Sequence, residues 1–153
     1  MELIKKYFWV FFISMIPLIE LRGAIPYGVA AGLPVVTAFI VSIIGNILPV
    51  PFVIIFIRKI IEIMKKMSKN IRKFAEWLER KAEKNKETVL RYEFWGLMLL
   101  VAIPLPGTGA WTGALVAAML DMQLKRAFPS IAVGVVVAGI VVSLATMGVI
   151  AIV

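Results

Sequence analysis

The chain has 153 residues, 61% of them hydrophobic, with a mean hydropathy of +0.97 and a net charge of +8. A soluble domain is only about 45–50% apolar, so this composition predicts an integral membrane protein. The chain has no cysteine and no histidine, which excludes disulfides, thiol chemistry, histidine proton relays and the usual zinc sites, and we predict a non-enzyme without metal or cofactor.

Residues 7–33 are predicted to form a helical hairpin that enters the membrane and returns to the same face. A spanning helix needs about 20 apolar residues, and neither arm reaches that length because Glu20 and Arg22 interrupt the segment. Pro17 and Pro26 flank the charged pair as helix breakers. One long span with a kinked centre is the alternative. The charges stand where a signal peptide would have small neutral residues, so we predict mature structure.

Residues 37–57 are predicted to form the first membrane-spanning helix, because they contain no charged side chain. Pro49 and Pro51 are predicted to kink this helix, since proline removes a backbone hydrogen bond. Asn46, near the middle of the span, is a candidate binding residue. A hydrogen bond between helices is the equally good alternative for that side chain.

Residues 58–92 are predicted to form an amphipathic linker helix, lying on the membrane surface or packed beneath the core, with a break at residues 68–70. Its apolar stripe consists of Ile60, Met64, Met67, Ile71, Phe74 and Leu78. Twelve of the 17 Lys/Arg residues lie here, which favours a cytoplasmic linker in a multi-pass protein of the plasma membrane. Charge flanking a membrane span needs no nucleic-acid partner, and none is predicted.

Residues 94–120 repeat the pattern of a short apolar arm, a break and a second short arm. The break is PLPGTG, which holds prolines at 104 and 106 and no charged residue. A second uninterrupted apolar segment follows at residues 129–152. We therefore predict a second hairpin over 94–120 and a second membrane span over 129–152.

The two halves of the chain also share short matches at the same spacing. Ile103-Pro104-Leu105 corresponds to Ile16-Pro17-Leu18, and each hairpin is followed by one span. Each half then crosses the membrane once, so the second half enters from the opposite face. We predict an all-α membrane domain over 1–153, an inverted repeat of re-entrant hairpin plus transmembrane helix, with repeats at 1–57 and 93–153.

The two hairpin tips are the predicted binding site, because ionisable groups inside a membrane are rare and mark function. The returning helix is predicted to begin near Gly23–Pro26, so that its free N–H groups stand beside Arg22 as an anion site. Thr108 is a candidate N-cap, and Trp111 is predicted to wall a cavity. The predicted substrate- or ion-binding residues are Glu20, Arg22, Gly23, Asn46, Thr108, Gly109, Trp111 and Thr112. Alternatively, Glu20 and Arg22 form a purely structural ion pair.

The segments ELRGAIPYG at 20–28 and IPLPGTGAWTG at 103–113 resemble those of the small multidrug export protein family. That family is similar to the DedA (VTT-domain) superfamily, whose members are expected to have two opposed re-entrant hairpins. The resemblance implies transport of polyprenyl-phosphate or phospholipid molecules, with an acidic residue and arginines in the hairpins. Glu20 and Arg22 match that description, whereas residues 104–113 contain no charge and depart from it.

The main functional hypothesis is a transporter or flippase for an amphiphilic anion such as a lipid phosphate. Arg22 would bind the head group, and Glu20 would take and release a proton as the cavity changes face. A small-molecule exporter or ion channel that uses the same cavity is the first alternative, and a non-transporting membrane scaffold is the second. Membrane lipids and a second copy in a homodimer are the predicted partners.

Overall fold

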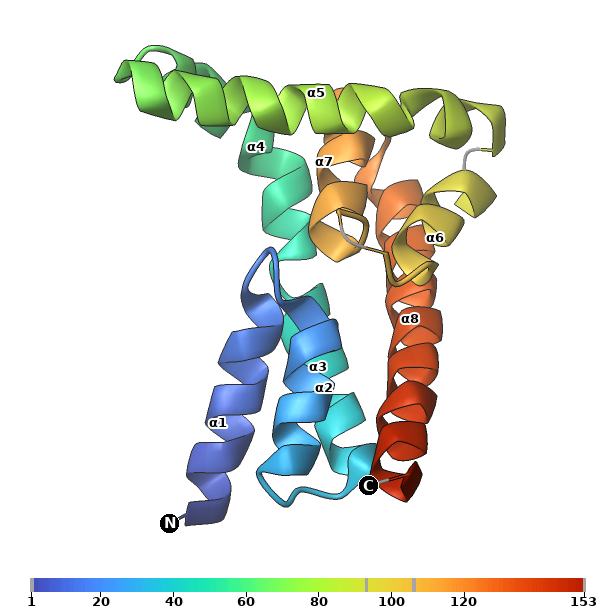
Figure 1. Ribbon diagram of the computed structural model, residues 1–153. Coiled ribbons are helices and arrows are strands. Elements are labelled where there is room, and N and C mark those ends of the chain that lie inside the picture. The colour runs from blue at the N-terminus through green and yellow to red at the C-terminus, as the bar shows by residue number, and fades with distance from the viewer. Residues whose placement is uncertain (1, 93, 106, 153) are drawn as a thin grey trace.

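The computed structural model describes residues 2–92, 94–105 and 107–152 and contains helices and no strand within them (Figure 1). The described helices, in chain order, are α1 Glu2–Met15, α2 Glu20–Ala30, α3 Val35–Ile47, α4 Val50–Lys65, α5 Lys69–Tyr92, α6 Phe94–Ala102, α7 Ala110–Met119 and α8 Leu124–Ile152. The all-α prediction is confirmed for this part of the chain. Residues 93, 106 and 153, which belong to the predicted second repeat, lie outside it.

Two helical stretches, Val35–Ile57 and Leu124–Ala151, are long and apolar enough to cross a membrane. A helix rises about 1.5 Å per residue, so lengths of 23 and 28 residues exceed a hydrocarbon core of about 30 Å. The predicted number of spans is therefore confirmed by length and composition. The second stretch begins five residues before the predicted boundary at 129, because Pro129 lies inside α8 and does not start it.

The first span is interrupted at the predicted prolines. Helix α3 ends at Ile47 and α4 begins at Val50, while Leu48 and Pro49 keep right-handed helical dihedrals between them. Pro49 and Pro51 have no N–H to donate to the carbonyls four residues earlier, so the helical hydrogen bonding lapses there. Helix α4 then continues beyond the predicted end of the span to Lys65. The second half of this span and the first part of the linker are thus one helix.

Two pairs of shorter helices form hairpins, α1 with α2 and α6 with α7. At about 1.5 Å per residue, α1 is about 21 Å long and the other three are about 14–17 Å. Figure 1 shows the tip of the α1–α2 hairpin and the tip of the α6–α7 hairpin pointing toward each other from opposite ends of the molecule. Helix α1 begins at Glu2, before the predicted start of the hairpin at residue 7, because the helix extends beyond the apolar run.

Helix α5 lies across one end of the molecule and packs on α4, α6 and α7 (Figure 1). The linker breaks between Lys65 and Lys69, slightly before the predicted residues 68–70, and the Lys65 ammonium contacts the Glu79 carboxylate at 2.6 Å across that break. The predicted apolar stripe is not the buried face of the linker: Ile60, Met67 and Phe74 of the stripe are exposed, whereas the buried side chains are those of Ile61 and Ala75. The side chain of Leu78, part of that stripe, lies outside the described residues.

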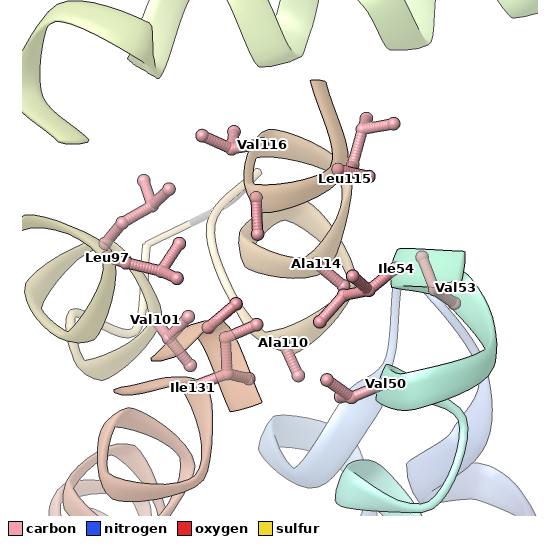
Figure 2. Close-up of a cluster of buried hydrophobic side chains, with 14 of the residues drawn as sticks. Val50, Val53, Ile54, Leu97, Val101, Ala110, Ala114, Leu115, Val116 and Ile131 are labelled. Carbon is pink, nitrogen blue, oxygen red and sulfur yellow. The ribbon is translucent and has the colours of Figure 1, made fainter. Parts of the chain in front are cut away.

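The main core surrounds α7, which is the most enclosed helix. Figure 2 shows its side chains packed between α4 on one side and α6 with α8 on the other. Gly134 lets α8 approach α6, because a Cβ there would lie 2.7 Å from the Met98 carbonyl oxygen. A smaller cluster joins the first three helices through Val10, Ala24, Leu33 and Ala38. The second hairpin is thus held in apolar packing on several sides.

Candidate functional site

The two hairpin tips meet in hydrogen bonds between residues that are far apart in the sequence. Arg22 of the first tip contacts Thr108 of the second, and Glu20 of the first contacts Trp111 of the second. Gly109 lies directly against the Glu20 carboxylate. The structure therefore brings five of the eight predicted binding residues into one tip-to-tip contact.

Glu20 caps the helix that leaves the second tip. Its side chain is 3% exposed, and its Oε1 accepts the backbone N–H of Trp111 at 3.1 Å. A carboxylate is favoured there because the first N–H groups of α7 have no partner within the helix and carry partial positive charge. The backbone of Glu20 has φ of +51°, which is uncommon for a residue other than glycine and marks a position held by its surroundings.

Gly109 is required by this contact. A Cβ on Gly109 would lie 2.1 Å from Glu20 Oε2, and the residue has φ of +117°, where side chains are rarely tolerated. Thr108 was the predicted N-cap of α7, but the residue in that position is Gly109, which has no side chain to donate or accept. The prediction was wrong because the capping oxygen comes from the other hairpin.

Arg22 holds the opposite side of the second tip. Its guanidinium donates to the backbone carbonyls of Leu105 and Ile103 and, at 2.8 Å, to the hydroxyl oxygen of Thr108. The carbonyls follow the C-terminus of α6, where the helix carries partial negative charge. The Thr108 hydroxyl lies 2.6 Å from the Ile103 carbonyl oxygen and donates within the same turn.

Helix α2 does not begin where the breakers suggested. It starts at Glu20, and the Gly23 N–H already donates to the Ile19 carbonyl at 3.1 Å. The predicted row of free N–H groups at Gly23–Pro26 is therefore absent from this described segment. Pro26 lies inside α2, where its missing N–H leaves the Arg22 carbonyl without its usual helical partner. Arg22 thus stands among backbone carbonyls and not among free N–H groups.

Trp111 fastens the second tip to the first hairpin, and Thr112 braces the loop of the second tip itself. The Trp111 indole N–H donates to the Met15 carbonyl, the last residue of α1, at 3.0 Å. The Thr112 hydroxyl donates to the Gly107 carbonyl at 3.0 Å. Trp111 was predicted to wall a cavity, and it instead joins the two tips.

Asn46 is enclosed within the described helices without a hydrogen-bond partner. It is 1% exposed, and neither its amide nitrogen nor its amide oxygen is paired within the described residues. Ser42, one turn earlier on α3, is also fully buried with an unpaired hydroxyl. A buried polar group without a hydrogen-bond partner costs about 1–3 kcal/mol of stability. Two such side chains on one face of α3 are therefore unusual. Within the described residues, the Asn46 side chain makes no hydrogen bond to Glu20 or Arg22.

A cavity of about 740 Å³ lies between α2 and α8 and starts at the tip contact. Arg22 and Pro104 line it near the tips, and the walls continue along both helices away from them. The lining residues are Arg22, Pro26, Val29, Ala30, Pro104, Val141, Val142, Ala145, Thr146, Val149 and Ile150. Arg22 is the charged member of this described lining, and its Nε is buried without a partner. The cavity therefore combines apolar walls with one cation at the tip end.

Lys81 is a residue of the tip region that sequence reasoning missed. It belongs to α5, yet its Cε and Nζ lie 3.2 and 3.5 Å from where a Cβ of Gly107 would stand. Its ammonium also lies 4.8 Å from the centroid of the Trp77 ring. In the sequence Lys81 is one of many linker cations, and no local pattern distinguishes it from its neighbours.

A protein-family model described as "Putative small multi-drug export protein" matches residues 20–141. The match covers both hairpin tips, both spans in large part and the linker between them. No curated relative and no solved structure matches the chain. The relationship to the DedA superfamily stays a prediction from the two tip motifs.

Proposed function

The chain belongs to the small multi-drug export protein family, whose name describes a membrane transporter, and from this premise we propose that it moves an amphiphilic anion across the membrane. The observation that carries the proposal is the cavity between α2 and α8, with apolar walls and Arg22 at its tip end. Such a cavity suits a molecule with an acyl or prenyl chain and an anionic head group. Lipid phosphates, including polyprenyl phosphates and phospholipids, have this chemistry.

A lipophilic cation, the common form of an exported drug, fits the cavity less well. A guanidinium on the wall of an apolar cavity repels a cation strongly, because the surroundings screen charge poorly. Neutral or anionic small molecules stay compatible with the same cavity. Export of small molecules is therefore the second candidate function, favoured by the family name, and it predicts transport without a lipid requirement.

The membrane arrangement belongs to the same proposal. The α1–α2 and α6–α7 hairpins would enter the membrane from opposite faces without crossing it, as the two halves of an inverted repeat. The opposed tips in Figure 1 and the helix lengths support this. Helix α5 would lie at the cytoplasmic face of the plasma membrane, because the linker is rich in Lys and Arg. A homodimer would cover part of the exposed apolar surface.

Glu20 would couple transport to protons through the tip contact. As a carboxylate it stabilises the N-terminus of α7, and such charge–dipole contacts contribute about 0.3–2 kcal/mol. Protonation removes the charge and weakens the hold of the first tip on the second. Arg22 and Lys81 are the neighbouring charges that act on Glu20. Release of the tips would then open the cavity toward the other side.

Filling the cavity tests the proposed function without touching the tip contact. Ala145→Trp places an indole on the cavity wall, and Leu144→Trp places the same group on the neighbouring exposed position of α8, where Leu144 is 60% exposed. In liposomes that contain a labelled polyprenyl phosphate, the purified protein should move the lipid between leaflets, Ala145→Trp should stop it and Leu144→Trp should not. Equal rates with and without the protein would reject lipid transport.

A further inference from the structure

Two buried polar side chains of the first span, Ser42 and Asn46, take no part in the tip contact or in the cavity. Both lie near the middle of the apolar stretch Val35–Ile57, and neither lines the cavity between α2 and α8. The Ser42 hydroxyl and both polar atoms of the Asn46 amide have no hydrogen-bond partner within the described residues. The transport proposal therefore leaves this pair unexplained.

Ser42 and Asn46 point into the seam where α2, α3 and α8 meet. On α3, Ala38 packs on α2 and Phe39 packs on α8, each against a glycine of that helix. At 3.6 residues per turn, Ser42 and Asn46 project in the directions between these two contacts, one turn apart. Helices α2, α3 and α8 also contact one another in pairs. The two polar side chains therefore share one interior seam, the α2–α3–α8 seam.

Helix α3 ends in a break of helical hydrogen bonding directly after Asn46 and its neighbour. The last helical bond of α3 comes from the Leu48 N–H, and the first bond of α4 goes to the Pro49 carbonyl. Between them, the carbonyls of residues 45–48 accept no backbone hydrogen bond from the described part of the chain. Two of these carbonyls lose their partners because Pro49 and Pro51 have no N–H. Four backbone oxygens thus stand at the negative end of α3.

The oxygen atoms gathered here are all neutral: an amide oxygen, a hydroxyl oxygen and backbone carbonyls. In membrane transporters, carbonyls of broken helices and the C-terminal ends of half-helices coordinate Na⁺. The negative end of α3 repels an anion. A divalent cation takes carboxylate ligands, and the described residues contain no group of three or more Asp, Glu, His or Cys side chains that could hold one. The chemistry of the seam therefore suits a monovalent cation.

We propose that Ser42, Asn46 and the C-terminal end of α3 bind one sodium or potassium ion in the α2–α3–α8 seam. The ion takes the amide oxygen of Asn46 and the hydroxyl oxygen of Ser42, which gives both side chains the partner that the helix packing denies them. It also attracts the carbonyls beside Pro49, and so ties the two halves of the first span together at their break. The inference concerns binding alone and holds or fails independently of lipid transport.

The test measures the stability of the purified full chain in micelles while choline chloride is replaced by sodium chloride or potassium chloride at constant ionic strength. A ligand that binds one site of the folded protein lowers the unfolding equilibrium constant in proportion to its concentration, once this exceeds the dissociation constant. Urea unfolding should therefore show about a tenfold drop in that constant for each tenfold rise in the bound cation. Equal stability in all three salts would mean that water alone satisfies the two side chains, and would overturn the proposal.

Substitutions in the seam locate the ion. Ser42→Ala and Asn46→Leu should each abolish the response to the cation. Ser14→Ala is the matched control, because its hydroxyl is as buried as that of Ser42 but donates to the Phe11 carbonyl of α1, and this variant should respond like the wild type. A response that survives in Ser42→Ala and Asn46→Leu, or that is lost equally in Ser14→Ala, would contradict the site.

The stability of Asn46→Leu in choline chloride separates cation binding from a structural role of the amide. Leucine removes a buried amide that has no partner, so the variant should be at least as stable as the wild type without the cation. Lower stability of this variant in choline chloride would assign Asn46 a hydrogen bond between helices and overturn its role as a ligand.

Discussion

The two hairpin tips resemble each other in their helix breakers and differ in their charge. The first tip supplies side chains, Glu20 and Arg22, and the second supplies backbone groups at the end of α6 and the start of α7. The carboxylate meets the N-terminus of one helix and the guanidinium meets the C-terminal carbonyls of the other. Each charge therefore complements the helix end that it contacts.

This difference explains why the charged pair is not principally an ion pair. The hydrogen bonds that the structure shows for Glu20 and Arg22 go to separate parts of the second tip. A neutral tip with glycines and prolines leaves its backbone groups accessible, and a charged tip satisfies them. The structural alternative of mutual neutralisation accounts for the net charge but not for these partners.

Exchanging the charges should have the largest effect. The double variant Glu20→Arg with Arg22→Glu keeps the composition and the net charge but sets each charge against the wrong helix end. Buried charges without partners cost about 3–5 kcal/mol, so the folded protein should be lost from detergent extracts. Size-exclusion chromatography measures the folded fraction. Glu76→Arg with Arg80→Glu, an exchange within the exposed pair on α5, is the matched control and should fold normally.

Gly109→Ala should have the next largest effect. The new methyl group meets the Glu20 carboxylate, and the backbone conformation of this residue suits only glycine, so we expect a loss of about 2–4 kcal/mol in the free energy of unfolding. Gly148→Ala is the control, because nothing lies within 4 Å of its added Cβ. Denaturant unfolding in micelles compares the two, and equal stability would show that the tips do not meet as described.

How far the sequence predicted this arrangement depends on the range of the interactions. The spans, the kink at Pro49 and the break after Lys65 follow from composition and from proline, which act within a few residues. The cap of α7 does not follow from such local features, because Glu20 lies 91 residues before Trp111. Local rules named Thr108 as the cap and could not anticipate an oxygen from another hairpin.

Lys81 shows the same limit more clearly. Its contact with Gly107 depends on where α5 crosses α6 and α7, which no periodicity in the linker records. The predicted start of α2 near Gly23–Pro26 failed for a related reason. Proline is common in the first turn of a helix, and Pro26 was predicted to lie in such a turn. In the structure, an earlier turn at residues 16–19 starts the helix at Glu20 instead.

Thr108→Val should have a smaller effect than the glycine substitution. Valine keeps the shape and removes the hydroxyl that accepts from Arg22 and donates to the Ile103 carbonyl, a loss of about 1–2 kcal/mol. Thr146→Val removes a hydroxyl whose hydrogen bond goes to the Val142 carbonyl of its own helix, and this variant should cost less. The same unfolding measurement ranks the two. A larger loss of stability in Thr146→Val than in Thr108→Val would argue against the contact between Arg22 and Thr108.

Glu20→Gln should change stability least and transport most. The glutamine oxygen still accepts the Trp111 N–H, so the fold should lose only about 1 kcal/mol from the missing charge. The side chain no longer exchanges a proton, and lipid movement driven by a pH gradient in liposomes should cease. Normal gradient-driven movement in this variant would remove Glu20 from the coupling.

The most direct test of the tip pairing is the nuclear magnetic resonance signal of the Trp111 backbone amide. The chain has four tryptophans, so ¹⁵N-tryptophan labelling in nanodiscs gives a spectrum simple enough to assign. In the wild-type protein the Trp111 amide should be protected from hydrogen exchange, and Glu20→Ala should remove that protection while Glu62→Ala leaves it. A Trp111 amide that exchanges equally in the wild type and in Glu20→Ala would contradict the pairing of the charged tip with the neutral one.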